Sequence, residues 1–352
     1  MIEREREKEM IFLKICSILV VTLFVCVCIG GDATEPINVG IIFTKAATNE
    51  NLRNKFRTCV LSILKYARVD INFYIIGDAE SQAIAKRTFA RVRNLSIKYE
   101  LKPVDADDLA RKMHALVAKM QKHFSHSPSS YYGDSLFFLS IGLVKVFDPA
   151  IKRMILLDSD LKFKEDIGQL HALFDKFSAT NIIGIARDAQ PVYRHNLWKY
   201  RHDHPSTRVG DPPPHGITGF NSGVLLMDLE RMRHSRLYHN LIRPDTVEKL
   251  TEKYSFRGHL GDQDFFSLIS FEHQELFYVL PCTWNRQLCT WWMSGYPDVF
   301  DQYFRCDERE HGKVKVYHGN CNTPIPTDED DAEFATSVNF NFIDPNDDKQ
   351  DL

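Results

Sequence analysis

The sequence lacks a large excess of charge of either sign. Its 44 lysines and arginines are nearly balanced by 47 aspartates and glutamates, and the formal net charge is −3. A nucleic-acid binder needs a basic surface, so this balance argues against a nucleic-acid partner. Long low-complexity tracts and obvious internal repeats are missing as well. The 352 residues, 44% of them hydrophobic, are instead typical of a folded catalytic protein with one large α/β domain or two small ones.

The N-terminus differs from the rest of the chain. Residues 11–29 are apolar apart from Lys14, Ser17 and Thr22. About 20 apolar residues cross a bilayer, and the basic residues before the run favour a cytosolic N-terminus. We therefore predict a cytosolic tail (1–10), a signal-anchor (11–29) and a short stem (30–37), with a cleaved signal peptide as the alternative. Both interpretations place the remaining chain in the lumen of the secretory pathway.

Two short motifs agree with a lumenal location. Asn94-Leu95-Ser96 is an acceptor sequon for N-glycosylation. The last four residues, Lys-Gln-Asp-Leu, are similar to the signals that return lumenal proteins to the endoplasmic reticulum. The predicted location is the endoplasmic reticulum membrane, as a single-pass type II protein, rather than the Golgi.

Of the eight cysteines, three lie in the apolar run 11–29 and four, Cys282, Cys289, Cys306 and Cys321, cluster near the C-terminus. In an oxidising lumen these four predict two disulfides. Three connectivities are possible, and we favour the two short loops, which join the first cysteine to the second and the third to the fourth. A zinc site is the alternative, but close Cys-x-x-Cys pairs are absent. Cys59 lies in an apolar helical pattern and predicts a buried thiol.

The hydrophobic pattern predicts an α/β sheet with helices on both faces. Strands are predicted at 38–44 and 71–77, each followed by a helical pattern, at 51–67 and 81–94. Such sheets bind ligands beyond the C-terminal ends of their strands. Further along, the pattern predicts helices at 134–147 and 260–271 and strands at 153–157, 224–227 and 314–317.

Two segments have no clear periodicity. Residues 190–216 are polar and rich in histidine, arginine and proline, and they predict a long loop or lid. The segment 327–352 is an acidic tail that we expect to pack at the periphery of a catalytic domain spanning 38–326.

Asp158-Ser159-Asp160 directly follows the apolar strand at 153–157. Side chains at i and i+2 of an extended chain point to the same side, so the two carboxylates can share one divalent cation. Three other Asp-x-Asp triplets lack this position after an apolar strand, and a solvated turn is the alternative interpretation of Asp158-Ser159-Asp160. His318 ends another predicted strand. Carboxylate oxygens with one imidazole suit Mn²⁺, or Mg²⁺.

Several other residues allow both a structural and a functional interpretation. Asp262 is either the N-cap of a helix or, with Gln263, a ligand for sugar hydroxyls. Residues 221–223, Asn-Ser-Gly, are either a tight turn or a place where the backbone meets a sugar. Tryptophans pack in cores by default, but in loops they also bind sugars and partner proteins, and Trp198 is the better surface candidate.

Three segments, 155–160, 220–229 and 260–266, resemble glycosyltransferase family eight. Segments 282–292 and 317–326 are similar to the corresponding segments of those family members that extend an existing xyloside. The resemblance spans roughly 38–326. It implies a GT-A fold with a single mixed, mostly parallel sheet, UDP-xylose as donor, Mn²⁺ as cofactor and retention of the α configuration. It also implies an acceptor: the terminal xylose of a xylose–glucose disaccharide on EGF-like repeats, as in Notch receptors, joined by an α-1,3 linkage.

The resemblance also assigns roles to residues. It implies metal binding by Asp158, Asp160 and His318, acceptor binding by Trp198 and Trp291, and catalytic roles for Gln263 and Asn320, which would line the developing sugar cation. The residues implied in donor binding are Thr44, Lys45, Ser159, Asn221, Ser222, Leu260, Asp262, Gln263 and Asn320.

The chain departs from the family pattern at two cations. Many members carry a lysine after the metal histidine, and many carry an arginine on the helix before the Asp-x-Asp strand, where this chain has Ser140 or Ile141. The diphosphate would then be held by the metal ion and Asn320. The alternatives to a xyloside-extending transferase are a lectin-like binder without turnover, a member that adds xylose directly to O-linked glucose, and a metal-dependent hydrolase.

Overall fold

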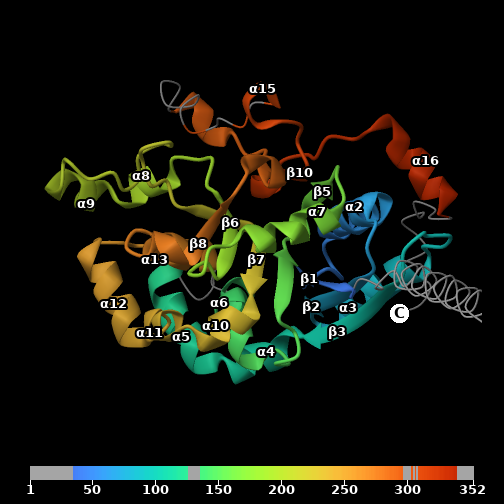
Figure 1. The fold of residues 1–352 in the computed structure, drawn as a ribbon, viewed down its shortest axis with the longest axis horizontal. Coiled ribbons are helices and arrows are strands. Elements are labelled where there is room, and N and C mark those ends of the chain that lie inside the picture. Colours follow the sequence, from blue (N-terminus) through green and yellow to red (C-terminus); the bar gives the residue numbers. More distant parts are fainter. Residues whose placement is uncertain (1–34, 126–134, 296–302, 304–305, 307, 339–352) are drawn as a thin grey trace, which may run out of the picture. The chain divides into compact units, whose positions relative to one another are not determined.

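The computed structural model describes residues 35–125, 135–295, 303, 306 and 308–338 (Figure 1). The predicted cytosolic tail and signal-anchor, most of the stem and the Lys-Gln-Asp-Leu terminus lie outside these residues. Within them, every helix is too short or too polar to span a bilayer.

The main sheet has seven strands in the order β3-β2-β1-β4-β7-β6-β8. All strands but β7 run in the same direction, so a mixed, mostly parallel sheet is confirmed. The strands are β1 (Ile37–Ile42), β2 (Ile71–Gly77), β3 (Tyr99–Asp105), β4 (Arg153–Leu157), β6 (Ile183–Arg187), β7 (Phe220–Asp228) and β8 (Phe277–Leu280).

A second, three-stranded sheet contradicts the prediction of a single sheet. It contains β5 (Leu161–Phe163), β10 (Val316–His318) and β9 (Arg286–Gln287), in that order. β5 pairs antiparallel with β10, and β9 pairs parallel with it. β5 and β9 were not predicted, because strands of two or three residues are too short to show an alternating pattern, whereas β10 overlaps the strand predicted at 314–317.

Alternating side chains of the strands pack against helices on both faces of the main sheet, as predicted. Phe73 and Ile75 belong to a core with α2 and α3, whereas Tyr74 and Ile76 belong to a second core with α4, α5 and α6. The helices are α2 (Glu50–Tyr66), α3 (Ala79–Ala90), α4 (Ala106–Lys112), α5 (His114–Phe124), α6 (Leu139–Val146), α7 (Ile167–His171), α8 (Val192–Asn196), α9 (Trp198–Asp203), α10 (Leu229–His234), α11 (Arg236–Leu241), α12 (Pro244–Lys253), α13 (Asp262–Ser270), α15 (Glu308–His311) and α16 (Glu329–Ser337).

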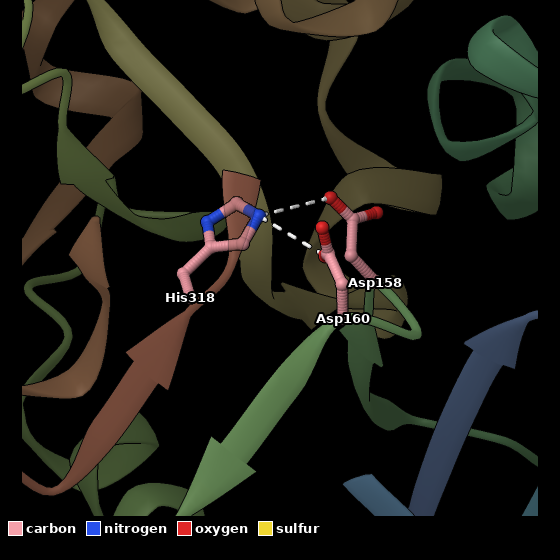
Figure 2. A group of neighbouring side chains, drawn as sticks. All are labelled: Asp158, Asp160 and His318. Carbon is pink, nitrogen blue, oxygen red and sulfur yellow. Dashed lines mark ion pairs between the residues drawn. The ribbon is translucent and has the colours of Figure 1, made fainter. Parts of the chain in front are cut away.

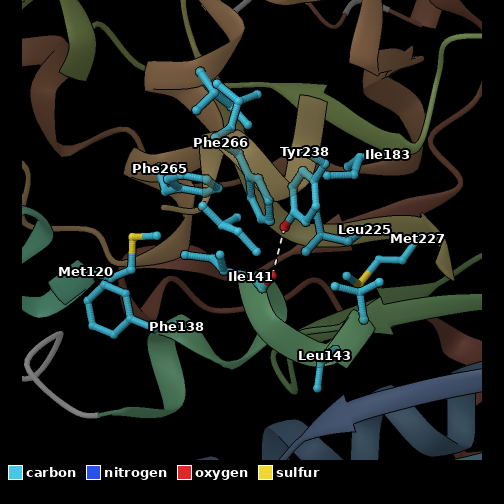
Figure 3. Packing of buried hydrophobic residues seen from close by; sticks show 14 of the residues in the cluster. Met120, Phe138, Ile141, Leu143, Ile183, Leu225, Met227, Tyr238, Phe265 and Phe266 are labelled. Atoms are coloured by element: carbon cyan, nitrogen blue, oxygen red, sulfur yellow. Dashed lines mark hydrogen bonds between the residues drawn. The ribbon is translucent and has the colours of Figure 1, made fainter. Parts of the chain in front are cut away.

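The second core holds the helix that carries the candidate sugar-binding residues. Phe265 and Phe266 of α13 are fully buried beside α6 and α11 (Figure 3). The buried Tyr238 hydroxyl of α11 donates a 2.9 Å hydrogen bond to the carbonyl of Ile141 in α6. This bond ties α11 to α6, and α13 packs against the same core, so the N-terminus of α13 has a defined position beside the start of β7.

Two predicted segments differ from the structure. The long loop at 190–216 is partly helical, because α8 and α9 lie within it. These helices have five and six residues, less than two turns, so they show no helical periodicity. The helix predicted from residue 134 begins as a 3-10 turn, and α6 starts only at Leu139.

The favoured disulfide pairing is wrong, although all four cysteines are bonded. The pairs are Cys282–Cys306 and Cys289–Cys321. Cys289 follows β9 and Cys321 follows β10, and the parallel pairing of these strands brings the two cysteines together, with their Cα atoms 5.5 Å apart. Spatial pairing of short strands, rather than the length of the loop, decides the connectivity. Cys59 is a buried free thiol, as predicted.

Candidate active site

The structure brings Asp158, Asp160 and His318 together where the two sheets meet (Figure 2). Asp158 follows β4, Asp160 precedes β5 and His318 ends β10. His318 Nε2 lies 3.3 Å from Asp160 Oδ1 and 3.7 Å from Asp158 Oδ2. One ligand atom from each residue lies within 4.8 Å of the others. The three polar groups therefore converge on one point, as a shared cation requires.

Backbone contacts hold this geometry. The Asp158 N–H donates to the Gly223 carbonyl of β7 at 3.0 Å, and the Gly319 N–H donates to the Asp160 carbonyl at 2.8 Å. A glycine at position 223 also leaves room for the His318 ring, because a Cβ atom there would lie 2.3 Å from Cε1 of His318. Asn221-Ser222-Gly223 is thus part of β7, at an irregularity in its pairing with β6, rather than a separate turn.

The electrostatics of the triad come from two acids beside one imidazole. Desolvation and the like charge of Asp160 raise the pKa of Asp158 to about 6, although 47% of its side chain is exposed. Desolvation opposes ionisation of Asp160, but His318 lowers its pKa overall. Burial disfavours the imidazolium of His318, yet Asp160 and Asp158 raise its pKa above the ordinary value. The two carboxylates therefore favour a positive charge between the three side chains. Without a metal ion, a proton on His318 supplies part of this positive charge.

The donor set fits a hard divalent cation. Two carboxylates and one imidazole are ligands that Mn²⁺ and Mg²⁺ accept, and the exposed side of Asp158 leaves room for oxygens of a phosphate. A second acidic group, Asp328, Asp330 and Asp331, also clusters. Its carboxylates form ion pairs with Lys65, Lys162 and Lys164, so this group is explained by salt bridges.

Asp262 is not an N-cap, because Gly261 holds that position with φ +71° and Asp262 lies inside the first turn of α13. The Asp262 side chain instead accepts hydrogen bonds from the hydroxyls of Ser140 and Ser222. Burial raises its pKa to about 7, and the charge of Asp158 adds to this rise. Asp262 therefore lies within electrostatic reach of the triad. Ser140, one of the two positions considered for the missing family arginine, holds Asp262 in place.

Three other predicted donor residues have defined partners. Asn221 Nδ2 donates to Gln263 Oε1 at 3.0 Å, and both side chains are buried. Leu260 is held through its backbone, because its N–H donates to the carboxylate of Asp264 at 2.6 Å. Ser159, between the two metal aspartates, is buried.

Asn320 has an orientation that changes its expected role. Its Oδ1 accepts hydrogen bonds from the backbone N–H groups of Leu288 at 3.0 Å and Cys289 at 2.9 Å. The oxygen is therefore occupied, and the amide NH₂ group is what Asn320 offers to a ligand. A donor suits phosphate oxygens better than a sugar cation, so this orientation favours the predicted contact of Asn320 with the diphosphate over its predicted contact with the sugar cation.

Thr44 and Lys45 follow β1, at the same sheet edge as Asp158, since Ile41 of β1 is opposite Leu157 of β4. Lys45 has φ +55°, and its N–H donates to Asp78 at 2.6 Å. Trp198 in α9 and Trp291 are 67% and 71% exposed, so both side chains are accessible to a ligand.

Sequence reasoning missed Lys55. Its Nζ lies 3.7 Å from Asp160 Oδ2 and 3.2 Å from the Gly319 carbonyl, and the side chain is only 15% exposed. Lys55, Cys59 and Ser62 are spaced four and three residues apart, so they share one face of α2. The Cys59 sulfur lies 3.9 Å from the Asp158 carbonyl, and Ser62 Oγ accepts from the Phe163 N–H. The spacing of these three residues along α2 is the sequence pattern from which Lys55 could have been predicted.

The comparisons agree with this geometry. The family model for glycosyl transferase family 8 matches residues 47–302. Xyloside xylosyltransferase 1 of mouse is 48% identical over 307 residues, which cover 85% of this chain and 77% of the mouse protein. The human xyloside xylosyltransferase 1 is also 48% identical, over 306 residues, with the same coverage.

Solved structures show the same fold. The crystal structure of mouse xyloside xylosyltransferase 1 in its apo form matches with a TM-score of 0.78, over 83% of this chain and 100% of that one. The galactosyltransferase LgtC is 15% identical with a TM-score of 0.53, which supports the fold alone. From the family model and the 48% identity, we conclude that the chain belongs to glycosyl transferase family 8.

Proposed function

We propose that this glycosyltransferase moves xylose from UDP-xylose to the terminal xylose of an O-linked xylose–glucose disaccharide on EGF-like repeats, forming an α-1,3 linkage with retention. The observation that carries the proposal is the convergence of Asp158, Asp160 and His318 in a chain 48% identical to mouse xyloside xylosyltransferase 1. A donor with a diphosphate needs a cation at this point, and these residues would hold Mn²⁺, or Mg²⁺.

The reaction breaks the bond between xylose C1 and the β-phosphate oxygen and forms a bond from C1 to the acceptor hydroxyl. The bound divalent cation would supply Lewis-acid stabilisation of the departing diphosphate. Lys55 and the Asn320 amide are placed to add a positive charge and a hydrogen-bond donor to the same group. They compensate for the two cations that the family pattern has and this chain lacks.

We further propose attack from the same face as the leaving group, with the departing phosphate taking the proton of the acceptor hydroxyl. Gln263 supports this because an amide can stabilise the positive charge that develops on the sugar without becoming a covalent nucleophile. Asp262, with its pKa raised to about 7, is a poor nucleophile when protonated and is held by two serine hydroxyls. Trapping a covalent xylosyl-enzyme on either residue would contradict front-face attack.

The test uses the full chain with UDP-xylose, Mn²⁺ and a folded EGF-like repeat that carries xylose–glucose, followed by intact mass. We expect a gain of one pentose, lost with EDTA and in the D160N variant. D108N is the matched control, because Asp108 forms exposed ion pairs in α4. No pentose gain in the wild-type chain would contradict the proposal.

The choice of acceptor separates the rivals. A repeat carrying only glucose should remain unmodified, whereas modification of that repeat would identify a transferase that adds xylose directly to O-glucose. Tight binding of the xylose–glucose repeat without turnover would identify a lectin-like binder. Release of free xylose without any dependence on the acceptor would identify a hydrolase.

A further inference from the structure

A line of buried side chains links the metal triad to Gln263. It runs from His318 in β10 through Asn285, just before β9, and Asn221 in β7 to Gln263 in α13. His318 Nδ1 lies 2.9 Å from Asn285 Oδ1, Asn285 Nδ2 lies 2.8 Å from Asn221 Oδ1, and Asn221 Nδ2 lies 3.0 Å from Gln263 Oε1. All four side chains belong to residues that are 9% exposed or less. Asn285 joins the two halves of this line.

Main-chain groups fix the direction of these hydrogen bonds. The Gly223 N–H donates to Asn221 Oδ1 at 3.2 Å, so this end of the Asn221 amide must be the oxygen. Asn285 Nδ2 also lies 3.4 Å from the Asn221 carbonyl, which only accepts, so this end of the Asn285 amide must be the nitrogen. Neither assignment depends on which nitrogen of His318 carries a proton.

The orientation of the Asn285 and Asn221 amides determines the hydrogen bonding of His318 at one end of the line and of Gln263 at the other. Asn285 must present its oxygen to His318, so the Nδ1 atom of His318 carries a proton and donates it. The other ring nitrogen, Nε2, which faces both aspartates, then has its lone pair available for a metal ion. At the far end, Asn221 must donate to Gln263, which fixes the Gln263 oxygen toward β7 and the plane of its amide.

We propose that Asn285 is a positioning residue that performs two tasks through its two ends. Its oxygen holds His318 in the tautomer that can bind a cation, and its nitrogen, through Asn221, holds Gln263 in the orientation used in transfer. The second task rests on the proposed function, whereas the first concerns cation binding alone. Asn285 itself would contact neither the sugar nor the metal ion.

Substitutions of Asn285 with nearly the same shape separate the two tasks. In N285L both hydrogen bonds are lost, so we expect the Mn²⁺ dissociation constant to rise roughly 10–100-fold and turnover to fall. In N285D the carboxylate still accepts from His318 but cannot donate to Asn221. We therefore expect N285D to bind Mn²⁺ at least as tightly as the wild-type chain, while kcat falls about tenfold or more with little change in the KM for UDP-xylose.

The experiment titrates the full chain with Mn²⁺, detecting free Mn²⁺ by electron paramagnetic resonance, and measures kcat and KM separately. N181L is the control for loss of a buried asparagine, since the buried Asn181, just before β6, accepts a hydrogen bond from the Ser178 N–H and donates one to the Glu275 carbonyl. We expect N181L to lower thermal stability but to leave the Mn²⁺ dissociation constant of the folded protein unchanged.

Two results would overturn the proposal. An unchanged Mn²⁺ dissociation constant in folded N285L would show that Asn285 does not prepare His318. Full kcat in N285D would show that the link to Gln263 is not used. If the wild-type chain transferred no xylose, the proposed function would fail, but the Mn²⁺ titrations of N285L and N285D would still decide the first task.

Discussion

Lys55 brings a positive charge to a site whose other charged groups include Asp158 and Asp160. In K55M we expect the dissociation constant for UDP-xylose to rise about tenfold or more, because a charge-assisted hydrogen bond contributes about 1.5–3 kcal/mol and each 1.4 kcal/mol is tenfold. Isothermal titration of UDP-xylose in saturating Mn²⁺ measures this constant.

K86M is the control for this prediction, since Lys86 is exposed on α3. K55R should recover part of the affinity because it keeps the charge. Unchanged donor affinity in K55M would show that Lys55 only neutralises Asp160.

Protons and the metal ion compete for the triad. Asp158 has a pKa of about 6 and the pKa of His318 is raised above its ordinary value, so both bind protons more readily than isolated side chains. Metal binding requires both to be deprotonated. We therefore expect the Mn²⁺ dissociation constant to rise by about tenfold or more between pH 7.5 and pH 5.5, measured from free Mn²⁺. A constant that is independent of pH over this range would contradict the assigned ligands.

The three proposed metal ligands could be selected from the sequence because their positions at strand ends are local information. Asp158 and Asp160 follow an apolar strand directly, and the structure places them as expected. Asn285 could not be found in this way. Its role depends on β7, β10 and α13 meeting around it, and these elements are far apart in the chain. Lys55 had a weaker local signal, the four-and-three spacing in α2.

At the scale of elements, α16 ties the acidic tail to the strand that follows the metal aspartates. Lys162 of β5 is 3% exposed, and its Nζ contacts Asp331 Oδ2 at 2.5 Å and the Pro326 carbonyl at 2.8 Å. Lys65 of α2 also pairs with Asp331, at 3.0 Å. The described part of the tail, residues 327–338, therefore packs against β5 and α2 through the buried ends of lysines rather than through an apolar helix face alone.

In D331N we expect α16 to open more often, with faster amide hydrogen exchange in 327–338 and an unchanged rate in the main sheet. Losing hydrogen bonds to charged groups costs about 1–3 kcal/mol. Partial burial opposes ionisation of Asp331, but Lys162 and its other donors lower its pKa to about 2. The stabilisation by its charge is thus fully present above about pH 4 and is lost as the pH falls through 2.

D330N is the matched control for α16, because the Asp330 side chain is 58% exposed and pairs only with Lys65 among the ion pairs of the described residues. It should leave hydrogen exchange in α16 nearly unchanged. Equal exchange in D331N and D330N would mean that apolar contacts, rather than Asp331, hold the helix.

The turn after β10 depends on the Cys289–Cys321 disulfide. Cys321 and Asn322 both have positive φ, at 53° and 60°, a conformation that costs energy and persists only where neighbouring structure imposes it. We expect the C289S/C321S variant to lose about 2–4 kcal/mol of unfolding free energy. It should also bind UDP-xylose less tightly, because Asn320 is held against Leu288 and Cys289.

Denaturant unfolding and donor titration measure these two effects. The C282S/C306S variant is the comparison, because it removes a similar covalent loop of 24 rather than 32 residues. We expect it to lose stability without the same loss of donor affinity. Equal donor affinity in both variants would show that β9 and β10 hold Asn320 without the disulfide.

Across the whole molecule, the site exists only where the two sheets meet. The main sheet supplies Asp158 and, through β7, Gly223, whereas the small sheet supplies His318. In the main sheet, β1, β2, β4 and β7 were predicted from their apolar runs, whereas β3, β6 and β8 were not predicted. In the small sheet only β10 was predicted, within 314–317, because β5 and β9, like the helices within 190–216, are too short to leave a periodic pattern. The disulfide pairing could not be predicted because it depends on contacts between distant parts of the chain.

We propose that the protein works in the endoplasmic reticulum, because it has two disulfides and an exposed Asn94. Asn94 lies in the turn between α3 and β3 with φ +58°, accessible to a glycosylating enzyme. In cells we expect one N-glycan that endoglycosidase H removes, absent in both N94Q and S96A. A glycan resistant to that enzyme would indicate passage through the Golgi. An unglycosylated chain with four reactive thiols among Cys282, Cys289, Cys306 and Cys321 would contradict a lumenal site altogether, because these cysteines stay reduced in the cytosol.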